Sequence, residues 1–96
     1  MPIKVGLDVG SVSVKLAAIL SPEETQALAK RLAETAVFRL VPESTEKSSA
    51  IGSGSIIVSE CRRSLGNPFQ AALDLLGEFQ MLLPDSWQFV LGVTGS

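Results

Sequence analysis

A short run near the amino terminus carries the residues with the clearest potential for chemistry: Asp8, Gly10, Ser11 and Lys15. An acidic residue at the end of a buried strand can hold a magnesium ion through water or orient a water molecule for attack. Gly10 lets the backbone approach a phosphate closely, and successive N–H groups of a turn form an anion-binding concavity. Ser11 adds a hydroxyl, and Lys15 adds a positive charge that reaches back toward the phosphates. The run therefore predicts a magnesium and phosphate site in which Asp8 is the catalytic and metal-binding group.

The same run also has a simpler interpretation, because Asp, Gly and Ser are common together in hairpin turns. Its position favours the phosphate loop, since it lies between two β-rich segments and is followed by a lysine. Val9 and Val12 flank the glycine and the serine. They complete the predicted nucleotide-binding segment.

Composition narrows the classes of function. The chain has 96 residues, which is enough for one domain. Its formal net charge is −2 and its basic residues are not clustered, which argues against a nucleic-acid-binding surface. One cysteine and no histidine exclude an internal disulfide and His-ligated zinc within this sequence. The longest apolar stretch, residues 16–20, is too short for a membrane span, so we expect a cytoplasmic protein.

The elements around the run can be predicted from local pattern. Alternation of apolar and polar residues predicts strands over residues 3–7 and 12–20, joined as an antiparallel hairpin. A capping box formed by Ser21 and Glu24 predicts a helix over residues 22–35. Residues 36–41 fit either a strand or the end of that helix. The serine- and glycine-rich residues 42–55 are typical of an exposed, mobile loop.

The carboxyl-terminal half continues with a strand over residues 56–62, a helix over residues 68–83 and a strand over residues 87–93. Asn67 is the expected cap of the helix, and Gln70 is expected to complete a capping box. The predicted buried stripe of this helix consists of Phe69, Ala72, Leu73, Leu76, Phe79 and Leu83. This order of elements predicts an α/β fold. Its open mixed sheet has three antiparallel strands and, after a crossover helix, a fourth strand parallel to the first and beside it.

Three single residues outside the run also attract attention. We expect Trp87 to pack in the core or at its rim, and a role as a binding aromatic is the alternative. Arg62 and Arg63 fit either a solvated strand end or a contact with a partner or nucleotide. The lone cysteine, Cys61, is expected either to be packed or to have no chemical role.

Residues 5–15 resemble the first phosphate loop of the acetate-and-sugar-kinase/Hsp70/actin superfamily. Within it, the sequence most resembles the activator ATPases of 2-hydroxyacyl-CoA dehydratases and benzoyl-CoA reductases, the BadF/BadG/BcrA/BcrD type. Residues 62–68 resemble the exit of that family's third strand, and residues 91–96 resemble the end of its fourth strand. The resemblance covers residues 1–20 and 56–96. Residues 21–55 depart from it as an inserted helix and serine-rich loop.

The resemblance implies that residues 1–96 are the amino-terminal part of an RNase H-like, actin-like ATPase domain, inactive without the rest of that domain. It implies Mg-ATP as cofactor, with Asp8, Gly10, Ser11 and Lys15 at the phosphates. It also implies a homodimer that shares a [4Fe-4S] cluster, whose ligands are not in this segment. A dehydratase or reductase partner would receive the electrons. The alternatives are a sugar or acyl kinase of the same superfold and a non-catalytic interaction module.

Overall fold

The computed structural model describes residues 2–42 and 55–95. These residues form an α/β structure in which six strands make one open mixed sheet and two helices pack against it. In chain order the elements are β1 (Ile3–Val9), β2 (Ser13–Leu20), α1 (Pro22–Ala33), β3 (Phe38–Pro42), β4 (Ser55–Ser59), β5 (Arg62–Arg63), α2 (Pro68–Leu82) and β6 (Phe89–Gly95).

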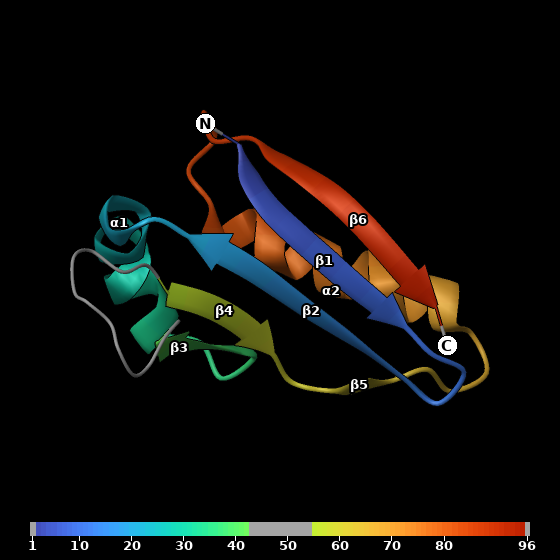
Figure 1. Ribbon diagram of the computed structural model, residues 1–96. Helices are drawn as coiled ribbons and strands as arrows, with labels where there is room; N and C mark the ends of the chain where they lie inside the picture. Colours follow the sequence, from blue (N-terminus) through green and yellow to red (C-terminus); the bar gives the residue numbers. More distant parts are fainter. Residues whose placement is uncertain (1, 43–54, 96) are drawn as a thin grey trace.

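The strands lie in the order β3-β4-β2-β1-β6, and β5 pairs with β2 further along from β4 (Figure 1). All neighbouring strands are antiparallel except β1 and β6, which are parallel. Helix α2 connects β5 to β6 and crosses one face of the sheet (Figure 1). The predicted arrangement of three antiparallel strands, a crossover helix and a parallel strand beside the first is therefore confirmed.

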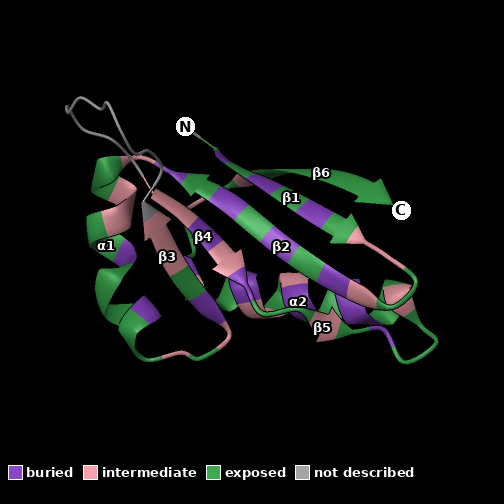
Figure 2. Cartoon of the chain, turned by 60° about the horizontal axis from the view of Figure 1, so that its bottom comes forward, coloured by how far each residue is buried: buried purple, intermediate pink, exposed green. Residues whose placement is uncertain are grey.

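The core lies between α2 and one face of the sheet. Every second residue of β1 and β2 is buried on this face, and the residues between them are exposed (Figure 2). This is the period of two that a strand requires when one of its faces is covered. Phe79 of α2 stacks edge to face with Phe38 at 5.7 Å and with Phe89 at 6.0 Å between ring centroids. Aromatic contacts therefore tie the helix to both outer strands of the sheet.

The buried side of α2 differs from the predicted stripe. Ala71 and Leu75 are buried, whereas Phe69 is 71% exposed and Leu73 is 47% exposed. Leu73 is two positions from Leu75 and therefore lies on nearly the opposite side of the helix. Only one of these two apolar faces can contact the sheet, so the predicted stripe was wrong at Phe69 and Leu73.

The helix starts follow the local sequence. Ser21 Oγ accepts a hydrogen bond from the Glu24 N–H (3.1 Å), and Glu24 Oε1 accepts one from the Ser21 N–H (2.8 Å), which confirms the capping box of α1. Asn67 caps α2 by accepting a hydrogen bond from the Gln70 N–H (3.1 Å). The Gln70 side chain, however, donates to Asp74 Oδ1 (2.9 Å), so the second predicted capping box was wrong. The Gln70 amide bonds along its own helix, to a side chain one turn on, rather than back to the cap.

The middle of the chain contains the largest differences from expectation. Residues 38–42 form the edge strand β3, which decides the ambiguity of residues 36–41. Most of the predicted loop, residues 43–54, lies outside the described residues. Trp87 does not begin the last strand, because its N–H donates to the Pro84 carbonyl (3.0 Å) in a turn, and β6 starts at Phe89.

The expected continuous strand over residues 56–62 is divided into β4 and β5. Val58 lies opposite Ala17 and Arg62 lies opposite Val14, so residues 59–61 face residues 15–16 with one residue in excess. An extra residue on one strand of an antiparallel pair is a β-bulge. The prediction of one unbroken strand was wrong because apolar alternation does not report a single inserted residue.

Candidate functional site

The face of the sheet opposite α2 carries side chains in rows across β2, β1 and β6. One row, called here the floor, consists of the register partners Ala17, Gly6 and Gly92. The next row toward the β1–β2 turn, called here the polar row, consists of Lys15, Asp8 and Thr94. Because the floor has no side chain larger than a methyl group, a hollow of about 540 Å³ lies over it. The hollow is lined by Gly6, Leu7, Asp8, Lys15, Leu16, Ala17, Val58, Gly92, Val93 and Thr94.

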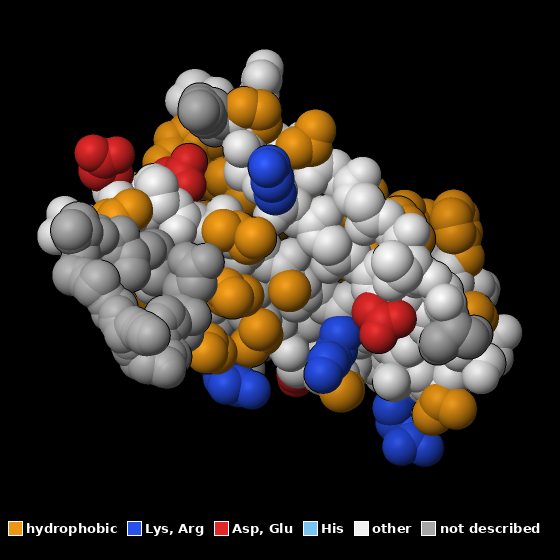
Figure 3. Space-filling model, in the orientation of Figure 1, with side chains coloured by type: hydrophobic (Ala, Val, Ile, Leu, Met, Phe, Trp, Pro, Cys, Tyr) orange, Lys and Arg blue, Asp and Glu red, His pale blue; other side chains and the backbone are white. Residues whose placement is uncertain are grey.

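The hairpin register brings the two predicted charged residues together. Asp8 and Lys15 are direct partners in the antiparallel pair of β1 and β2, and both side chains are exposed. Directly opposed residues have Cβ atoms about 4.5–5.5 Å apart. The ion pairs that the described residues form all involve Arg62, so Asp8 and Lys15 are not tied to each other. Figure 3 shows an acidic and a basic side chain close together on this face, near the end of β1 and the start of β2.

Thr94 is the member of the polar row that sequence reasoning missed. It lies beside Asp8 in the parallel pair of β1 and β6, and its Oγ1 is 3.5 Å from the Leu7 carbonyl oxygen. The sequence signal that could have identified Thr94 was its position at the end of a strand predicted to lie parallel to β1 and beside it. In a parallel pair the carboxyl ends of both strands meet at the same edge of the sheet.

The β1–β2 turn is held in place by Ser64, which is 3% exposed. The Ser64 Oγ donates to the Gly10 carbonyl (3.1 Å), and the Ser64 N–H donates to the Val12 carbonyl (2.8 Å). The Gly10 N–H donates to the Ser13 carbonyl (3.0 Å) and is therefore already used. Within the described ranges, the N–H groups of Ser11 and Val12 have no partner. These two amides are the backbone donors that the turn offers to an anion.

The remaining predicted residues lie at different places. Ser11 and Val12 are exposed at the tip of the turn, beyond the end of the polar row, and Val12 is 69% exposed. Val9 points to the other face of the sheet, where it packs against the core beside α2. The structure thus gathers Asp8 and Lys15 in one row, with Gly10, Ser11 and Val12 at the adjoining turn and Val9 on the reverse side.

The β-bulge contributes a buried residue next to the polar row. Ser59 is 6% exposed, and its Oγ accepts a hydrogen bond from the Leu16 N–H (2.9 Å). The same hydroxyl donates to the Glu60 carbonyl (2.8 Å). The Ser59 side chain thus supplies the acceptor that a regular ladder would take from the backbone. It fixes the course of β2 beside Lys15.

Arg62 has a structural role and does not line the hollow over the floor. Its guanidinium donates to both carboxylate oxygens of Glu78 (3.0 and 2.9 Å) and to Glu60 (3.0 Å). The hydrogen bonds with Glu78 raise the pKa of Arg62, against the opposing effect of partial burial. The hydrogen bonds with Arg62 lower the pKa of Glu78. Arg62 therefore links β5 to α2, whereas Arg63 is exposed.

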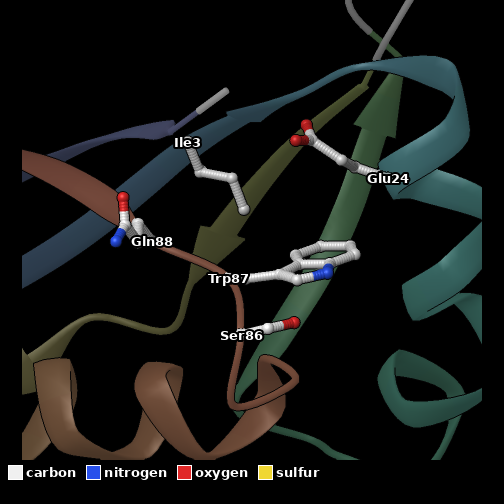
Figure 4. Close-up of a pocket in the computed structure, with 5 residues that line it drawn as sticks. All are labelled: Ile3, Glu24, Ser86, Trp87 and Gln88. Atoms are coloured by element: carbon white, nitrogen blue, oxygen red, sulfur yellow. The ribbon is translucent and has the colours of Figure 1, made fainter.

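A second, smaller hollow of about 290 Å³ lies at the other end of the sheet, between Ile3, Glu24, Ser86, Trp87 and Gln88 (Figure 4). Ile3 is at the start of β1 and Asp8 is near its end, so this hollow is remote from the polar row. The Glu24 carboxylate is used by the cap of α1. Trp87 is half-buried and packs against the core, which confirms the predicted packing in the core or at its rim.

Comparison with protein-family models, with curated proteins and with solved structures gave no match to this chain. Neither helix of the described part of the chain has the length and apolar character needed to cross a membrane.

Proposed function

We propose that the hollow over the floor binds the phosphate end of Mg-ATP, and that the chain is the phosphate-binding portion of an RNase H-like, actin-like ATPase domain. The observation that carries this proposal is the polar row. A carboxylate, an ammonium group and a hydroxyl stand side by side across three strands, next to a floor with no side chain larger than a methyl group and a turn with two available amides.

The chemistry of the row suits a magnesium–phosphate group. Mg²⁺ keeps several water ligands and is commonly held by one or two carboxylates together with substrate phosphates. Asp8 supplies one exposed carboxylate, which fits contact with the ion through water and orientation of an attacking water molecule. The Lys15 ammonium and the Ser11 and Val12 N–H groups face the charge that develops on the phosphates. The Thr94 hydroxyl adds a neutral donor on the other side of Asp8.

The floor supports the proposal because it lets a ligand approach the backbone. A Cβ atom added at Gly6 or Gly92 would meet nothing within 4 Å, so the space above both residues is empty. Glycine is expected where a phosphate approaches the main chain closely. The inserted residues 21–55 contribute α1 and β3 at the far edge of the sheet, away from the polar row.

The opposing wall of a nucleotide cleft, the activator role and the dehydratase or reductase partner follow from the resemblance and belong to the same proposal. One sheet face forms one side of a cleft, so we expect weak binding of Mg-ATP by these residues when nothing covers them. A [4Fe-4S] cluster takes four cysteine ligands, and the chain has one cysteine, Cys61. The residues present do not fit the cluster, and the proposal contains no step through it.

The test is a titration of the labelled chain with Mg-ATP, followed by amide chemical shifts. Shifts should concentrate at the floor, the polar row and the turn. Gly6→Val places a branched side chain in the empty space of the floor and should abolish the response without strain on the strand. Lys15→Ala should weaken binding by about 1–3 kcal/mol through loss of a charge-assisted contact.

The matched control for Lys15→Ala is Lys30→Ala, which removes the same charge from an exposed position on α1. It should leave the response unchanged. Equal losses in both variants would mean that ATP binds through general electrostatic attraction. Shifts confined to the surroundings of Trp87 would place any nucleotide in the other hollow and refute the proposal.

Hydrolysis distinguishes the roles within the site. In a protein that turns over ATP, Asp8→Asn should lower turnover much more than nucleotide affinity, because the carboxylate acts mainly in the transition state. A sugar or acyl kinase would use the same loop. Its ATP consumption would depend on an added sugar or carboxylate, whereas the activator ATPase would not need one.

A further inference from the structure

One buried residue, Ser64, holds the turn between β1 and β2 at two points. The Ser64 Oγ donates to the Gly10 carbonyl (3.1 Å), and the Ser64 N–H donates to the Val12 carbonyl (2.8 Å). Ser64 is buried, whereas Ser11, which lies between the two bonded residues, is exposed. The two hydrogen bonds therefore fix two peptide groups of the turn, one before Ser11 and one after Val12.

Peptide geometry converts the first of these bonds into a direction for the Ser11 N–H. A peptide group is planar and trans, so its carbonyl and its N–H point in opposite directions. The Gly10 carbonyl and the Ser11 N–H belong to the same peptide group. Because the Gly10 carbonyl points to the buried Ser64 hydroxyl, the Ser11 N–H points away from Ser64. Its direction is therefore set before any ligand binds.

The chain on both sides of Ser64 is itself anchored. Before Ser64, β5 pairs with β2, and the Arg62 guanidinium donates to both carboxylate oxygens of Glu78 on α2 (3.0 and 2.9 Å). After it, the Ser64 carbonyl accepts a hydrogen bond from the N–H of Asn67 (2.8 Å), the cap residue of α2. The position of the Ser64 hydroxyl is thus set by β2 and α2 and does not depend on the turn. Such a group can impose an orientation on the turn that it contacts.

We propose that Ser64 is a positioning residue of the phosphate site, whose hydroxyl holds the Gly10 carbonyl so that the Ser11 N–H is directed at an anion bound at the turn. The inference deepens the proposed function and rests on it, because the anion is a phosphate of Mg-ATP. A donor that is oriented before binding loses less conformational freedom when the ligand arrives.

The proposal also separates the two available amides of the turn. The Val12 N–H belongs to the peptide group of the Ser11 carbonyl, and among the described residues no hydrogen bond holds that carbonyl. Only the Ser11 N–H is therefore fixed in advance by Ser64. We assign it as the principal backbone donor of the turn.

The alternative is that the Ser64 hydroxyl only completes the hydrogen bonding of the turn. Gly10 is half-buried, so water could take the place of the hydroxyl at its carbonyl. The Ser11 N–H would then keep its direction without Ser64. Removal of the hydroxyl distinguishes the two cases.

The first measurement uses the full chain without ligand. Ser64→Ala removes the hydroxyl and keeps the hydrogen bond from the residue 64 N–H to the Val12 carbonyl, so the chain should fold as before. Amide nitrogen relaxation gives an order parameter for each N–H, which is about 0.85 for rigid backbone and below about 0.6 for flexible backbone. The order parameter of the Ser11 N–H should fall from the first value toward the second.

The Ser13 N–H is the internal control for this measurement. It belongs to the peptide group of the Val12 carbonyl, which stays bonded to the N–H of residue 64 in the variant. Its order parameter should therefore not change. An unchanged order parameter at Ser11 overturns the proposal. Equal losses at Ser11 and Ser13 also overturn it, because they would mean that the whole turn has loosened.

The second measurement is the titration of the same chain with Mg-ATP. Ser64→Ala should raise the dissociation constant about threefold to tenfold, which is the range expected for one hydrogen bond. The ligand-induced shift of the Ser11 amide should shrink, while the shifts of Gly92 and Thr94 persist at the floor and the polar row.

Thr25→Val is the matched control for the titration. The Thr25 hydroxyl also donates to a backbone carbonyl, that of Ser21 (2.8 Å), but on α1, which follows β2 at the end opposite the turn (Figure 1). This variant should leave the dissociation constant unchanged. Equal weakening by Thr25→Val and Ser64→Ala overturns the proposal, as does loss of order at Ser11 with an unchanged dissociation constant.

Failure of the proposed function gives a different result. A wild-type chain that does not respond to Mg-ATP would contradict the function proposed above. The order parameters of Ser11 and Ser13 in Ser64→Ala need no ligand, and they would still decide whether the Ser64 hydroxyl sets the direction of the Ser11 N–H.

Discussion

The hydroxyl of Ser59 offers a sharp test of how the bulge stabilises the sheet. Ser59→Ala removes the acceptor of the Leu16 N–H (2.9 Å) and the donor to the Glu60 carbonyl (2.8 Å). Leu16 is 1% exposed, so its N–H would be left unpaired in an apolar environment. A buried donor without a partner costs about 1–3 kcal/mol. Glu60 is exposed, so its carbonyl can bond to water. We therefore assign most of the cost to the Leu16 N–H and expect the free energy of unfolding to fall by about 2 kcal/mol.

Urea unfolding provides the assay. Trp87 is the only tryptophan and is half-buried against the core, so its fluorescence reports global unfolding. With a urea dependence of about 1–3 kcal/mol per M for a small protein, a loss of about 2 kcal/mol lowers the midpoint by about 1 M. The melting temperature should fall by roughly 8–16 °C, because each 1 kcal/mol shifts a domain of this size by about 4–8 °C.

The control is Ser86→Ala, since Ser86 is exposed. Its free energy of unfolding should stay within about 0.5 kcal/mol of wild type. If Ser59→Ala loses no more than this control, the Leu16 N–H has found another acceptor. The bulge would then not depend on the serine hydroxyl, and the account of how β2 is held beside Lys15 would be wrong.

Three further predictions concern stability and are checked by the same unfolding assay. Leu65 is 86% exposed and has a φ of 52°, and Gly66 follows it with a φ of 82°. Leu65→Asn should therefore stabilise the protein by about 1 kcal/mol, because asparagine tolerates the left-handed backbone better than leucine, and a neutral or destabilising result would refute this. Gly77→Ala adds a methyl group that meets nothing within 4 Å in α2 and should stabilise by about 0.5–1 kcal/mol; a loss would show that the glycine is needed for packing. Arg62 lowers the pKa of Glu78, so the contribution of this pair is complete above the unfolded carboxyl pKa of about 4.3 and is lost as pH falls through the lower folded pKa. Glu78→Gln should therefore cost at most about 1 kcal/mol at neutral pH, because the pair is partly exposed, and nothing at pH values below that folded pKa; a cost that is independent of pH would contradict the ion-pair origin.

Several features of the site were predictable because they depend on residues close together in the chain. The alternation over residues 12–20 predicted one buried and one open face for that strand, and Lys15 lies on the exposed face of β2. Asp8, which was predicted to follow the first strand, lies within β1 opposite Lys15. The caps at Ser21 and Asn67 are equally local, since each contact spans three residues. Signals of this kind are complete within one turn of helix or one pair of strands.

Other features required contacts that the linear pattern does not contain. Residues 36–41 were ambiguous, and pairing with β4 made the segment a strand. The buried side of α2 was decided by which apolar face met the sheet, which left Phe69 and Leu73 exposed.

By itself, the sequence determined the alternating faces of β2 and the starts of the helices. Only the tertiary structure decided that Thr94 completes the polar row, because it reaches Asp8 through a parallel pairing across most of the chain. The tertiary structure also decided the bulge at residues 59–61, where one extra residue is compensated by the Ser59 hydroxyl. The physical reason is that period and capping are set by neighbours in the chain, whereas register between distant strands is set by the whole packed sheet.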